Sequence, residues 1–485
     1  MSQAITAPIV RTIPLDHVSP DALFLRLKSP FLFEGTPKGW FDGAYTLIGL
    51  SPFAIFQSKG RRSRFETKQR DGHWNQQIDP DQDPLSVLQS HLNRFRPDQN
   101  IHNPALPFAS GGAVGFFAYD LIQTFEPVSA SRYVNPDLPD IYLQFINCFV
   151  LIETALSLVH IVFYPSCLIE IGWTYDAAYE AGCIETEAVE KVIQSVLSQS
   201  DQPVLPPAIE MTGHVSEKEY IEMVKRAKEY ISAGDIFQAN LSHRFHAHYK
   251  GESIFPLYQH LKKINPSPFS AYLNMGGVEI ASSSPERLVR VKKESGSFLI
   301  ETRPIAGTCP RGLTYEGDQA RIAAMYKDEK ERAEHLMLVD LERNDIGKVA
   351  QFGTVSVDPL MALERYSHVS HLVSNIVGRL RESVLTADVI RALFPGGTIT
   401  GVPKVRCMQI IAEMETRARG LYTGAIGMID FSGEIDLNIV IRSFIRQGSE
   451  LSFQVGAGIV ADSNPKMEYQ ETLHKAAALM KALGS

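Results

Sequence analysis

The stretch that decides the fold is a succession of three apolar runs: Gly424-Ala-Ile-Gly-Met-Ile-Asp430, Ile435-Asp-Leu-Asn-Ile-Val-Ile-Arg-Ser-Phe444 and Leu451-Ser-Phe-Gln-Val-Gly-Ala-Gly458. Each run is rich in residues that favour strands, and only a few residues separate one run from the next. Ser432-Gly433, between the first two runs, is typical of a hairpin turn. Strands joined by such short turns pair antiparallel, because a parallel pair needs a long crossover. We therefore predict antiparallel sheet in this stretch.

Similar runs precede it. We predict further strands at Ala239 to His246, Ser270 to Asn274, Val278 to Ser282 and Leu299 to Arg303. Gly276-Gly277 marks another hairpin, and Ser216-Glu-Lys-Glu219 has the pattern of a capping box that opens a helix through Ser232. Antiparallel sheet with helices outside, an α+β arrangement, fits this order better than regular βαβ alternation.

The N-terminal part has the same character and ends at a proline-rich segment. Strand-like runs such as Tyr45-Thr-Leu-Ile-Gly-Leu50 alternate with turns, and helices are predicted at Pro84 to Phe95 and at about Tyr175 to Ser198. Asp201-Gln-Pro-Val-Leu-Pro-Pro207 follows, where three prolines discourage regular structure. We predict a boundary there, between an N-terminal region, residues 1–200, and a C-terminal region, residues 212–485.

Composition narrows the class of protein. The 485 residues are 44% hydrophobic, enough to bury a large core, and the net charge is −8. A mildly acidic chain has no bulk attraction for nucleic acid or an anionic membrane, so we expect neither as a partner. The first residues do not resemble a signal peptide, no run of about 18 apolar residues occurs, and the five cysteines include no Cys-x-x-Cys pair. These features predict a cytoplasmic protein with free thiols.

Two glutamates fall on predicted helices. Glu334 lies in Glu331-Arg-Ala-Glu-His-Leu-Met-Leu338, and Glu471 lies in Glu468-Tyr-Gln-Glu-Thr-Leu-His-Lys475. Apolar neighbours are expected to bury one side of each helix and to leave the two carboxylates at its margin: Leu336, Leu338 and Val339 in the first, and Leu473, Ala476 and Leu479 in the second. A hard cation such as Mg²⁺ bridges such carboxylates to a substrate carboxylate. The alternative for either is a solvated surface residue, and Glu331 or Glu468 competes for the same role.

Several motifs occur in unbroken order between residues 212 and 482. They are Gly234-Asp-Ile-Phe-Gln-Ala-Asn-Leu-Ser242, Ser283-Ser-Pro-Glu-Arg287, Pro304-Ile-Ala-Gly-Thr308, Leu338-Val-Asp-Leu-Glu-Arg-Asn-Asp345, Arg365-Tyr-Ser-His-Val-Ser-His-Leu-Val-Ser374 and Gly456-Ala-Gly-Ile-Val-Ala-Asp-Ser463. In these motifs the chain resembles the chorismate-utilising enzymes, in particular the large subunits of anthranilate synthase and aminodeoxychorismate synthase. The resemblance implies two large, mostly antiparallel sheets packed together with helices outside, and an enzyme that depends on Mg²⁺.

The resemblance also implies roles in the pocket. Glu334 and Glu471 match the Mg²⁺ ligands. The residues implied to bind substrate are Gly307, Thr308, Thr398, Tyr422, Arg442, Gly456, Ala457, Gly458 and Lys475. From the residues alone, Arg442 is equally well explained as half of a buried ion pair, and Lys475 as a surface partner of Glu471 four residues earlier. Lys404 has the same two interpretations as Lys475, a contact with substrate or an ordinary ion pair.

Three residues are predicted to act in the chemistry. His371 matches the catalytic histidine of the family, although His368 competes for the role and a histidine among apolar residues is commonly structural. Glu286 matches the acid that protonates the departing C4 hydroxyl, a step that needs a carboxyl kept protonated in a partly dry pocket. Gln238 stands where enzymes that add water to chorismate carry a lysine base, so we predict ammonia as the attacking group.

The predicted product depends on Ala306. Aminodeoxychorismate synthases carry a lysine at this place in the motif, which attacks C2 so that ammonia ends at C4. The methyl group of Ala306 cannot act as a nucleophile. We therefore predict that ammonia attacks C2 directly, and that His371 accepts the C2 proton as pyruvate leaves and anthranilate forms. Asn240 and Gly397 resemble the aminodeoxychorismate branch instead, which is the alternative.

The remaining expectations concern a partner and regulation. The sequence contains no glutaminase nucleophile elbow, so the resemblance implies a separate glutamine amidotransferase subunit. Tryptophan-inhibited anthranilate synthases carry Leu-Leu-Glu-Ser and Asn-Pro-x-Pro-Tyr-Met, whereas this chain has Leu32-Phe-Glu-Gly35 and Asn265-Pro-Ser-Pro-Phe-Ser270. We therefore do not expect inhibition by tryptophan. The contrasting hypothesis is a ligand-sensing protein without catalysis, which would be expected to lack Glu334, Glu471 or Arg442.

Overall fold

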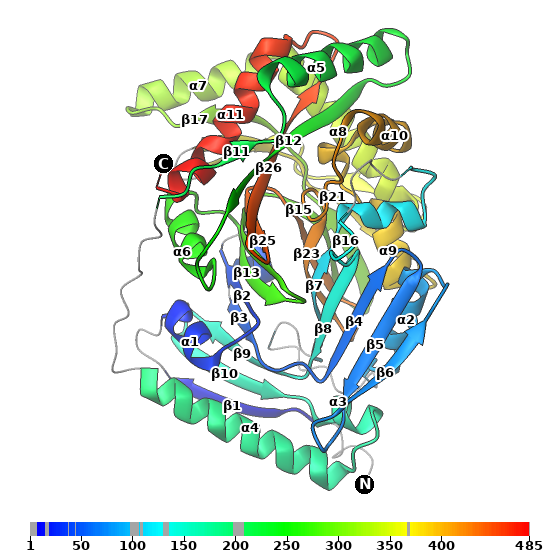
Figure 1. The fold of residues 1–485 in the computed structure, drawn as a ribbon, viewed down its shortest axis with the longest axis vertical. Helices are drawn as coiled ribbons and strands as arrows, with labels where there is room; N and C mark the ends of the chain where they lie inside the picture. Colours follow the sequence, from blue (N-terminus) through cyan, green and yellow to red (C-terminus); the bar gives the residue numbers. More distant parts are fainter. Residues whose placement is uncertain are drawn as a thin grey trace.

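The computed structural model describes residues 7–14, 19–36, 38–43, 45–97, 106, 110–129, 135–196, 208–365 and 369–484, with the side chains of Ala306 and Lys330 also outside the description. Within these residues, nearly all strands belong to two large antiparallel sheets, and the helices lie on the outside (Figure 1). The predicted α+β fold with two large sheets is therefore confirmed.

The first sheet contains, in spatial order, β1 (Ile9–Pro14), β10 (Leu158–Phe163), β9 (Cys148–Glu153), β3 (Tyr45–Gly49), β2 (Phe31–Gly35), β13 (Phe269–Met275), β14 (Val278–Ser284), β25 (Ser443–Gln447), β26 (Glu450–Ile459), β12 (Gln238–His248) and β11 (Thr212–Gly213), and β22 (Gly401–Val402) also pairs with β12. The second contains β18 (Ser356–Val357), β21 (Ile376–Arg379), β16 (Ser297–Thr302), β15 (Arg287–Glu294), β24 (Ile435–Ile439), β23 (Ala425–Asp430), β7 (Gly112–Phe117), β8 (Ile141–Ile146), β4 (Ala54–Lys59), β5 (Arg62–Lys68) and β6 (Trp74–Asp79). A small third sheet has the order β17 (Ile305–Pro310), β20 (Val369–Val373), β19 (Ala362–Arg365).

Each large sheet is built from both parts of the sequence. Strand β2 pairs with β13 in the first sheet, and β7 pairs with β23 in the second. The facing sheets share one continuous apolar core, which includes Phe33 and Phe149 of the first and Phe116 and Phe145 of the second. We retain residues 1–200 and 212–485 as a proposed division of the sequence. The predicted boundary segment, residues 201–207, lies outside the described residues.

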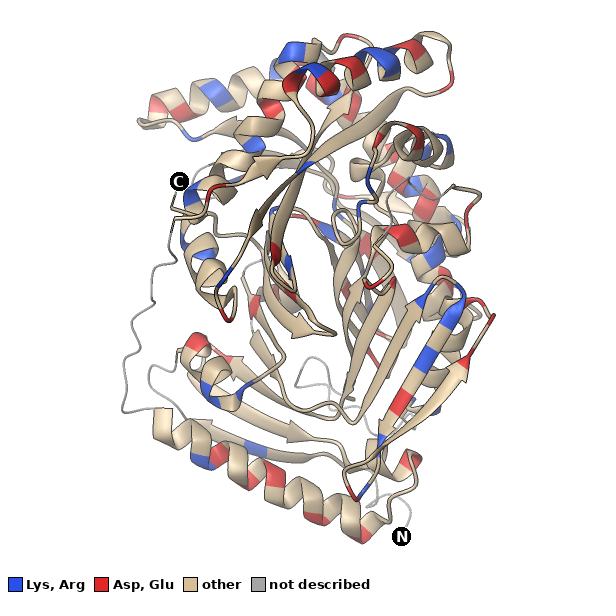
Figure 2. Ribbon diagram, viewed as in Figure 1, with Lys and Arg blue, Asp and Glu red and all other residues tan. Residues whose placement is uncertain are grey.

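Helices cover the outer surfaces of the sheets. Helix α4 (Tyr175–Val196) packs on β1 and β10, α6 (Phe255–Ile264) packs on β14, and α5 (Glu217–Ser232) and α11 (Pro465–Ala482) pack together over β12 and β26. The predicted capping box of α5 is present at Ser216 and Glu219. Figure 2 shows acidic and basic residues spread along α4 and α5, as expected of solvated helix faces. None of the helices in the described part of the chain has both the length and the apolar character that a membrane span requires.

One predicted strand is wrong. The run from Ile435 to Phe444 forms two strands, β24 and β25, which belong to different sheets. Between them the chain crosses from the second sheet to the first, and Arg442 adopts a left-handed backbone conformation with φ of 50°. That conformation is uncommon for a residue with a side chain and breaks the strand geometry. Arg442 therefore lies at the crossing between the sheets, not within a strand.

Candidate active site

A pair of glycines lines one side of the candidate site. In the ladder between β26 and β12, Gly456 pairs with Ser242, and Gly458 pairs with Asn240. A Cβ atom on Gly456 would lie 2.6 Å from Asn240 Oδ1 and 2.9 Å from the Tyr422 hydroxyl, and one on Gly458 would lie 2.5 Å from Gln238 Nε2. Any side chain at either position would collide with these polar groups. The glycines thus let polar side chains approach the backbone of Gly456, Ala457 and Gly458 closely.

Lys475 connects helix α11 to this glycine strand. Its Nζ donates a hydrogen bond to the Gly456 carbonyl oxygen at 3.0 Å and lies 2.8 Å from Glu471 Oε1. The Lys475 and Glu471 side chains are 43% and 50% exposed, so solvent reaches both groups. The i,i+4 pair predicted from spacing is therefore formed, and the same lysine also reaches the glycine strand.

Glu286 lies in the connection between β14 and β15 and is buried. Burial raises the pKa of its carboxyl group to about 7, while the nearby Thr398 hydroxyl and the charges of Arg442 and Lys475 lower it. The residues Glu286, Arg442 and Lys475, far apart in sequence, thus lie within electrostatic reach of one another.

His371 occupies β20 of the small sheet, opposite Thr308 of β17. Its Nδ1 is 2.8 Å from the Thr308 hydroxyl oxygen, and Gly307, with φ of 78°, forms the irregularity that precedes Thr308. Burial lowers the pKa of His371 to about 4, and the positive charge of Arg442 acts in the same direction. His371 is therefore neutral at pH 7 and close enough to Arg442 to respond to its charge.

Glu334 is half-buried on helix α8 (Glu329–Gly347), which packs against β17 and the turn Gly397–Ile399. The expectation that Leu336 is buried near Glu334 is wrong, because Leu336 is 47% exposed. The buried face of α8 follows His335, Leu338, Val339, Glu342 and Ile346, with the spacing of three and four residues that one helix face requires. Leu336 is one residue off this face.

The other expectations about single residues meet different outcomes. Lys404 forms an ion pair with the buried Asp345 and donates to the Leu393 carbonyl oxygen at 3.2 Å, which accounts for its charge without a ligand. His368 lies outside the described residues, as does the side chain of Ala306, whose backbone pairs with Leu372. The five cysteines are free thiols, as predicted.

Glu342 was not singled out from the sequence. Its carboxyl group is buried, accepts a hydrogen bond from the Thr302 hydroxyl at 2.8 Å, and has a pKa raised to about 8 by burial and by the negative charge of Glu286. A second buried acid therefore lies near Glu286. Its place in the buried row of α8, three residues after Val339 and four before Ile346, is the signal that could have identified it.

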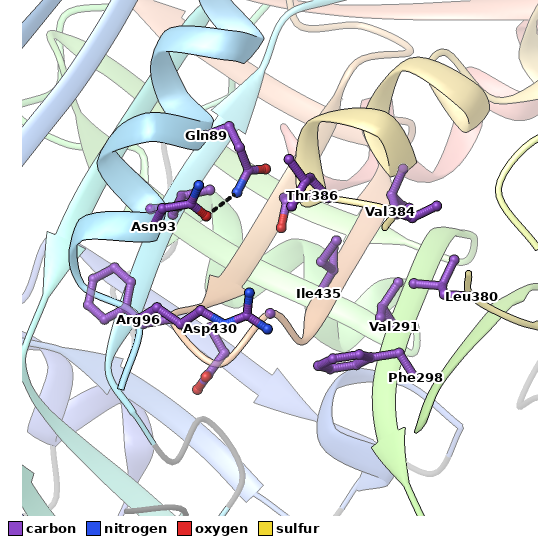
Figure 3. Close-up of a pocket in the computed structure, with 15 residues that line it drawn as sticks. Gln89, Asn93, Arg96, Val291, Phe298, Leu380, Val384, Thr386, Asp430 and Ile435 are labelled. Atoms are coloured by element: carbon purple, nitrogen blue, oxygen red, sulfur yellow. Dashed lines mark hydrogen bonds between the residues drawn. The ribbon is translucent and has the colours of Figure 1, made fainter. Parts of the chain in front are cut away.

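Two cavities lie near the predicted residues or next to the same sheets. A cavity of about 340 Å³ has Tyr422, Arg419 and Gln454 in its wall. A smaller pocket of about 50 Å³, between α2 (Pro84–Arg94), α9 (Thr386–Leu393) and the sheet, is lined by none of the predicted residues (Figure 3). In it the Gln89 amide donates to Asn93 Oδ1 at 2.8 Å. Ligand pockets usually enclose about 300 Å³ or more, so this pocket is too small for a substrate such as chorismate.

The chain is similar to known proteins over nearly its whole length. Residues 30–481 match the family described as chorismate binding enzyme. Anthranilate synthase component 1 of Acetivibrio thermocellus is 38% identical over 98% of this chain and 95% of its own length, and aminodeoxychorismate synthase component 1 of Bacillus subtilis (strain 168) is 37% identical over 91% and 89%. The crystal structure of anthranilate synthase component I from Streptococcus pneumoniae TIGR4, 31% identical, superposes with a TM-score of 0.76 over 90% of this chain and 92% of that one. With a match that spans both sheets and all the motifs of the site, the chain belongs to the family of chorismate-binding enzymes.

Proposed function

We propose that this protein is the large subunit of an anthranilate synthase, which converts chorismate and ammonia to anthranilate, pyruvate and water. The observation that carries the proposal is the buried carboxyl group of Glu286 within electrostatic reach of Arg442 and Lys475. This arrangement places an acid for the departing hydroxyl beside two cations that can pair with the carboxylates of chorismate. The similarity to anthranilate synthase component 1 supports the same choice. Product analysis with chorismate, Mg²⁺ and ammonium tests it.

Substrate binding is assigned to the residues around Glu286. Arg442 binds one carboxylate of chorismate, since a guanidinium offers two parallel donors to a carboxylate. The backbone of Gly456, Ala457 and Gly458 and the side chain of Lys475 face the same substrate. The groups assigned to the rest of the substrate are Gly307, Thr308, Thr398 and Tyr422.

The proposed chemistry divides between two groups. Glu286 gives its proton to the C4 hydroxyl, which leaves as water while the lone pair of ammonia forms a C–N bond at C2, and the new amine then loses a proton. His371, neutral at pH 7, accepts the C2 proton as the bond from the ring to the enolpyruvyl oxygen breaks. The enolpyruvate takes up a proton and leaves as pyruvate, and the ring becomes aromatic.

The proposed role of Glu286 predicts a dependence on pH. Because its pKa is raised to about 7, the acid form is present below pH 7 and is lost as the pH rises. With the concentration of free NH₃ held constant, kcat/KM for chorismate should fall about tenfold per pH unit above pH 7. Glu286→Gln should lower kcat/KM at least about a hundredfold and remove this decline. A Gln variant that keeps the same decline would show that another group is the acid.

Mg²⁺ is the cofactor that the family implies, and the donor groups fit it. Glu334 and Glu471 are carboxylates on helices next to the site, and neither is fully buried, so waters can complete the octahedral coordination that Mg²⁺ requires. Bound Mg²⁺ supplies positive charge that offsets a substrate carboxylate. We assign Glu334 and Glu471 as its ligands.

The ammonia is proposed to come from glutamine through a separate amidotransferase subunit, in the cytoplasm. A second candidate function is that of aminodeoxychorismate synthase component 1, which produces 4-amino-4-deoxychorismate. The 37% identity to the Bacillus subtilis protein and the presence of Asn240 and Gly397 favour it. Ala306 favours anthranilate, because C4 amination in that branch begins with a lysine at this place.

Tryptophan is expected not to inhibit this enzyme. Glu34, in the segment that resembles part of the effector site, is held by Lys262 at 2.9 Å and by the Tyr258 hydroxyl. The carboxylate that this segment would offer to an amino-acid effector is thus already engaged.

The measurement is initial rate against tryptophan concentration at subsaturating chorismate. We expect less than a twofold change at tryptophan concentrations that inhibit regulated family members. Direct titration by calorimetry is the control, because it detects binding that leaves the rate unchanged. Competitive or cooperative inhibition would contradict the prediction and would mean that an effector binds despite the contacts that hold Glu34.

A further inference from the structure

Two amide oxygens beside the glycine strand lack a hydrogen-bond donor. They are Gln238 Oε1 and Asn240 Oδ1, both of them buried atoms without a partner among the described residues. The Gln238 side chain as a whole is only 7% exposed. Buried acceptors in folded proteins are nearly always paired with a donor, so a pair of unpaired ones next to a site indicates that a ligand supplies the donors.

The two amides lie on one face of one strand. Gln238 and Asn240 are two residues apart on β12, and side chains with that spacing point to the same side of a sheet. Asn240 pairs with Gly458 of β26. A Cβ atom on Gly456 would lie 2.6 Å from Asn240 Oδ1, and one on Gly458 would lie 2.5 Å from Gln238 Nε2. Both amides therefore border the backbone that we assign to substrate binding.

The backbone that carries these amides is held firmly. The Asn240 N–H donates to the Thr400 carbonyl oxygen at 2.8 Å, and its carbonyl oxygen accepts from Arg419 Nη2 at 2.7 Å. Arg419 is itself buried and paired with Glu415 at 2.8 Å. The position of Asn240 is thus fixed by contacts that do not involve its side-chain oxygen, which leaves that oxygen for a ligand.

The chemistry of the substrates identifies the donor. The carboxylates of chorismate only accept hydrogen bonds, and they would be repelled by two carbonyl oxygens. The one O–H donor of chorismate is its C4 hydroxyl, which the proposed chemistry pairs with Glu286. Ammonia has three N–H donors and one lone pair, so it can give two N–H groups to the two oxygens and keep the lone pair for attack. Neither amide is a base, so a water molecule in the same place would not be activated.

We propose that Gln238 and Asn240 together bind the attacking ammonia, and that Asn240 is a determinant of nucleophile specificity in addition to Gln238. This inference rests on the proposed function, because it requires ammonia to be a substrate. It applies to both candidate products, since each of them contains nitrogen that comes from ammonia.

The test is the KM for ammonia, measured with chorismate saturating and with the concentration of free NH₃ calculated at each pH. Gln238→Met and Asn240→Val replace each amide with an apolar group of similar bulk. Each substitution therefore removes the acceptor oxygen. Each should raise the KM for ammonia about five- to tenfold, the effect of one lost hydrogen bond, and leave the KM for chorismate within twofold. The double variant should show coupling, because both residues contact one ligand.

Two controls separate binding from structural damage. Gln144→Met replaces another buried strand glutamine whose Oε1 lacks a partner among the described residues, but in β8 of the second sheet, and it should leave both KM values unchanged. Asn240→Asp keeps an acceptor at the same place and should retain a lower KM for ammonia than Asn240→Val.

The outcomes are distinguishable. If the wild-type protein makes no aminated product from ammonium and chorismate, the proposed function fails. If the wild-type protein is active but Gln238→Met and Asn240→Val leave the KM for ammonia unchanged, this inference fails and the proposed function stands. Equal increases in the KM for ammonia and for chorismate would also overturn it, because they would indicate a general distortion of the pocket.

Discussion

Glu334→Gln and Glu471→Gln are each expected to lower kcat/KM for chorismate about a thousandfold or more, without unfolding the protein. Each substitution keeps the size of the side chain and removes one hard anionic ligand, and Mg²⁺ binds neutral amides far less readily than carboxylates. A metal that offsets the charge of a substrate carboxylate stabilises the transition state by several kcal/mol. Losing that stabilisation lowers the rate by about a thousandfold.

The measurement is the dependence of rate on Mg²⁺ concentration, with the thermal unfolding midpoint recorded for each variant. Both carboxylates are partly exposed, so the free energy of unfolding should change by no more than about 1 kcal/mol. Glu329→Gln, an exposed glutamate on the same helix as Glu334, is the matched control and should behave as the wild-type protein does.

Glu331→Gln and Glu468→Gln decide between the competing assignments. These two variants could lose Mg²⁺-dependent activity while Glu334→Gln and Glu471→Gln keep it. That result would assign the Mg²⁺ ligands to Glu331 and Glu468 instead. Full activity of Glu334→Gln and Glu471→Gln at ordinary Mg²⁺ would contradict the metal assignment altogether.

The wild-type protein, given chorismate, Mg²⁺ and ammonium, is expected to release anthranilate and pyruvate without any added lyase. Anthranilate is fluorescent, and pyruvate can be measured in the same reaction. The expectation follows from Ala306, which leaves C2 open to ammonia. A product that yields 4-aminobenzoate only after a separate lyase is added would reject anthranilate synthesis and select the second candidate function.

Two variants locate the steps of this reaction. Ala306→Lys should lower the flux to anthranilate at least about tenfold, because the new side chain competes with ammonia for the same carbon. His371→Ala should slow anthranilate release by about a hundredfold and slow amination less, so that the aminated intermediate accumulates. Equal slowing of both steps by His371→Ala would show that the histidine is not the base of the elimination.

Local patterns in the sequence were sufficient for much of the fold. The capping box at Ser216 and Glu219 and the hairpin at Ser432-Gly433 depend on residues within one turn, and the structure confirms the elements that they begin or join. The family was likewise evident from motifs such as Ser283-Ser-Pro-Glu-Arg287, each of which is a short contiguous segment.

Other features depended on residues far away in the chain. The run from Ile435 to Phe444 has the composition of one strand, but its two ends find partners in different sheets, and only the packed structure places Arg442 at the crossing. Leu336 was expected to be buried together with Leu338 and Val339 near Glu334. Leu336 is exposed instead, because the face of α8 that packs against β17 and β21 is the one that carries Glu342.

What the sequence by itself determined was therefore the family, the antiparallel pairing and the residue types of the site, because these depend on short motifs and on the period of a strand or helix. Only the tertiary structure decided which charges are buried together. The pKa of Glu286 rises to about 7, and that of His371 falls to about 4, because burial in the assembled fold removes water around both side chains. The fold also brings the charge of Arg442 near both. Desolvation and long-range charge are properties of the assembled fold, and no local pattern encodes their size.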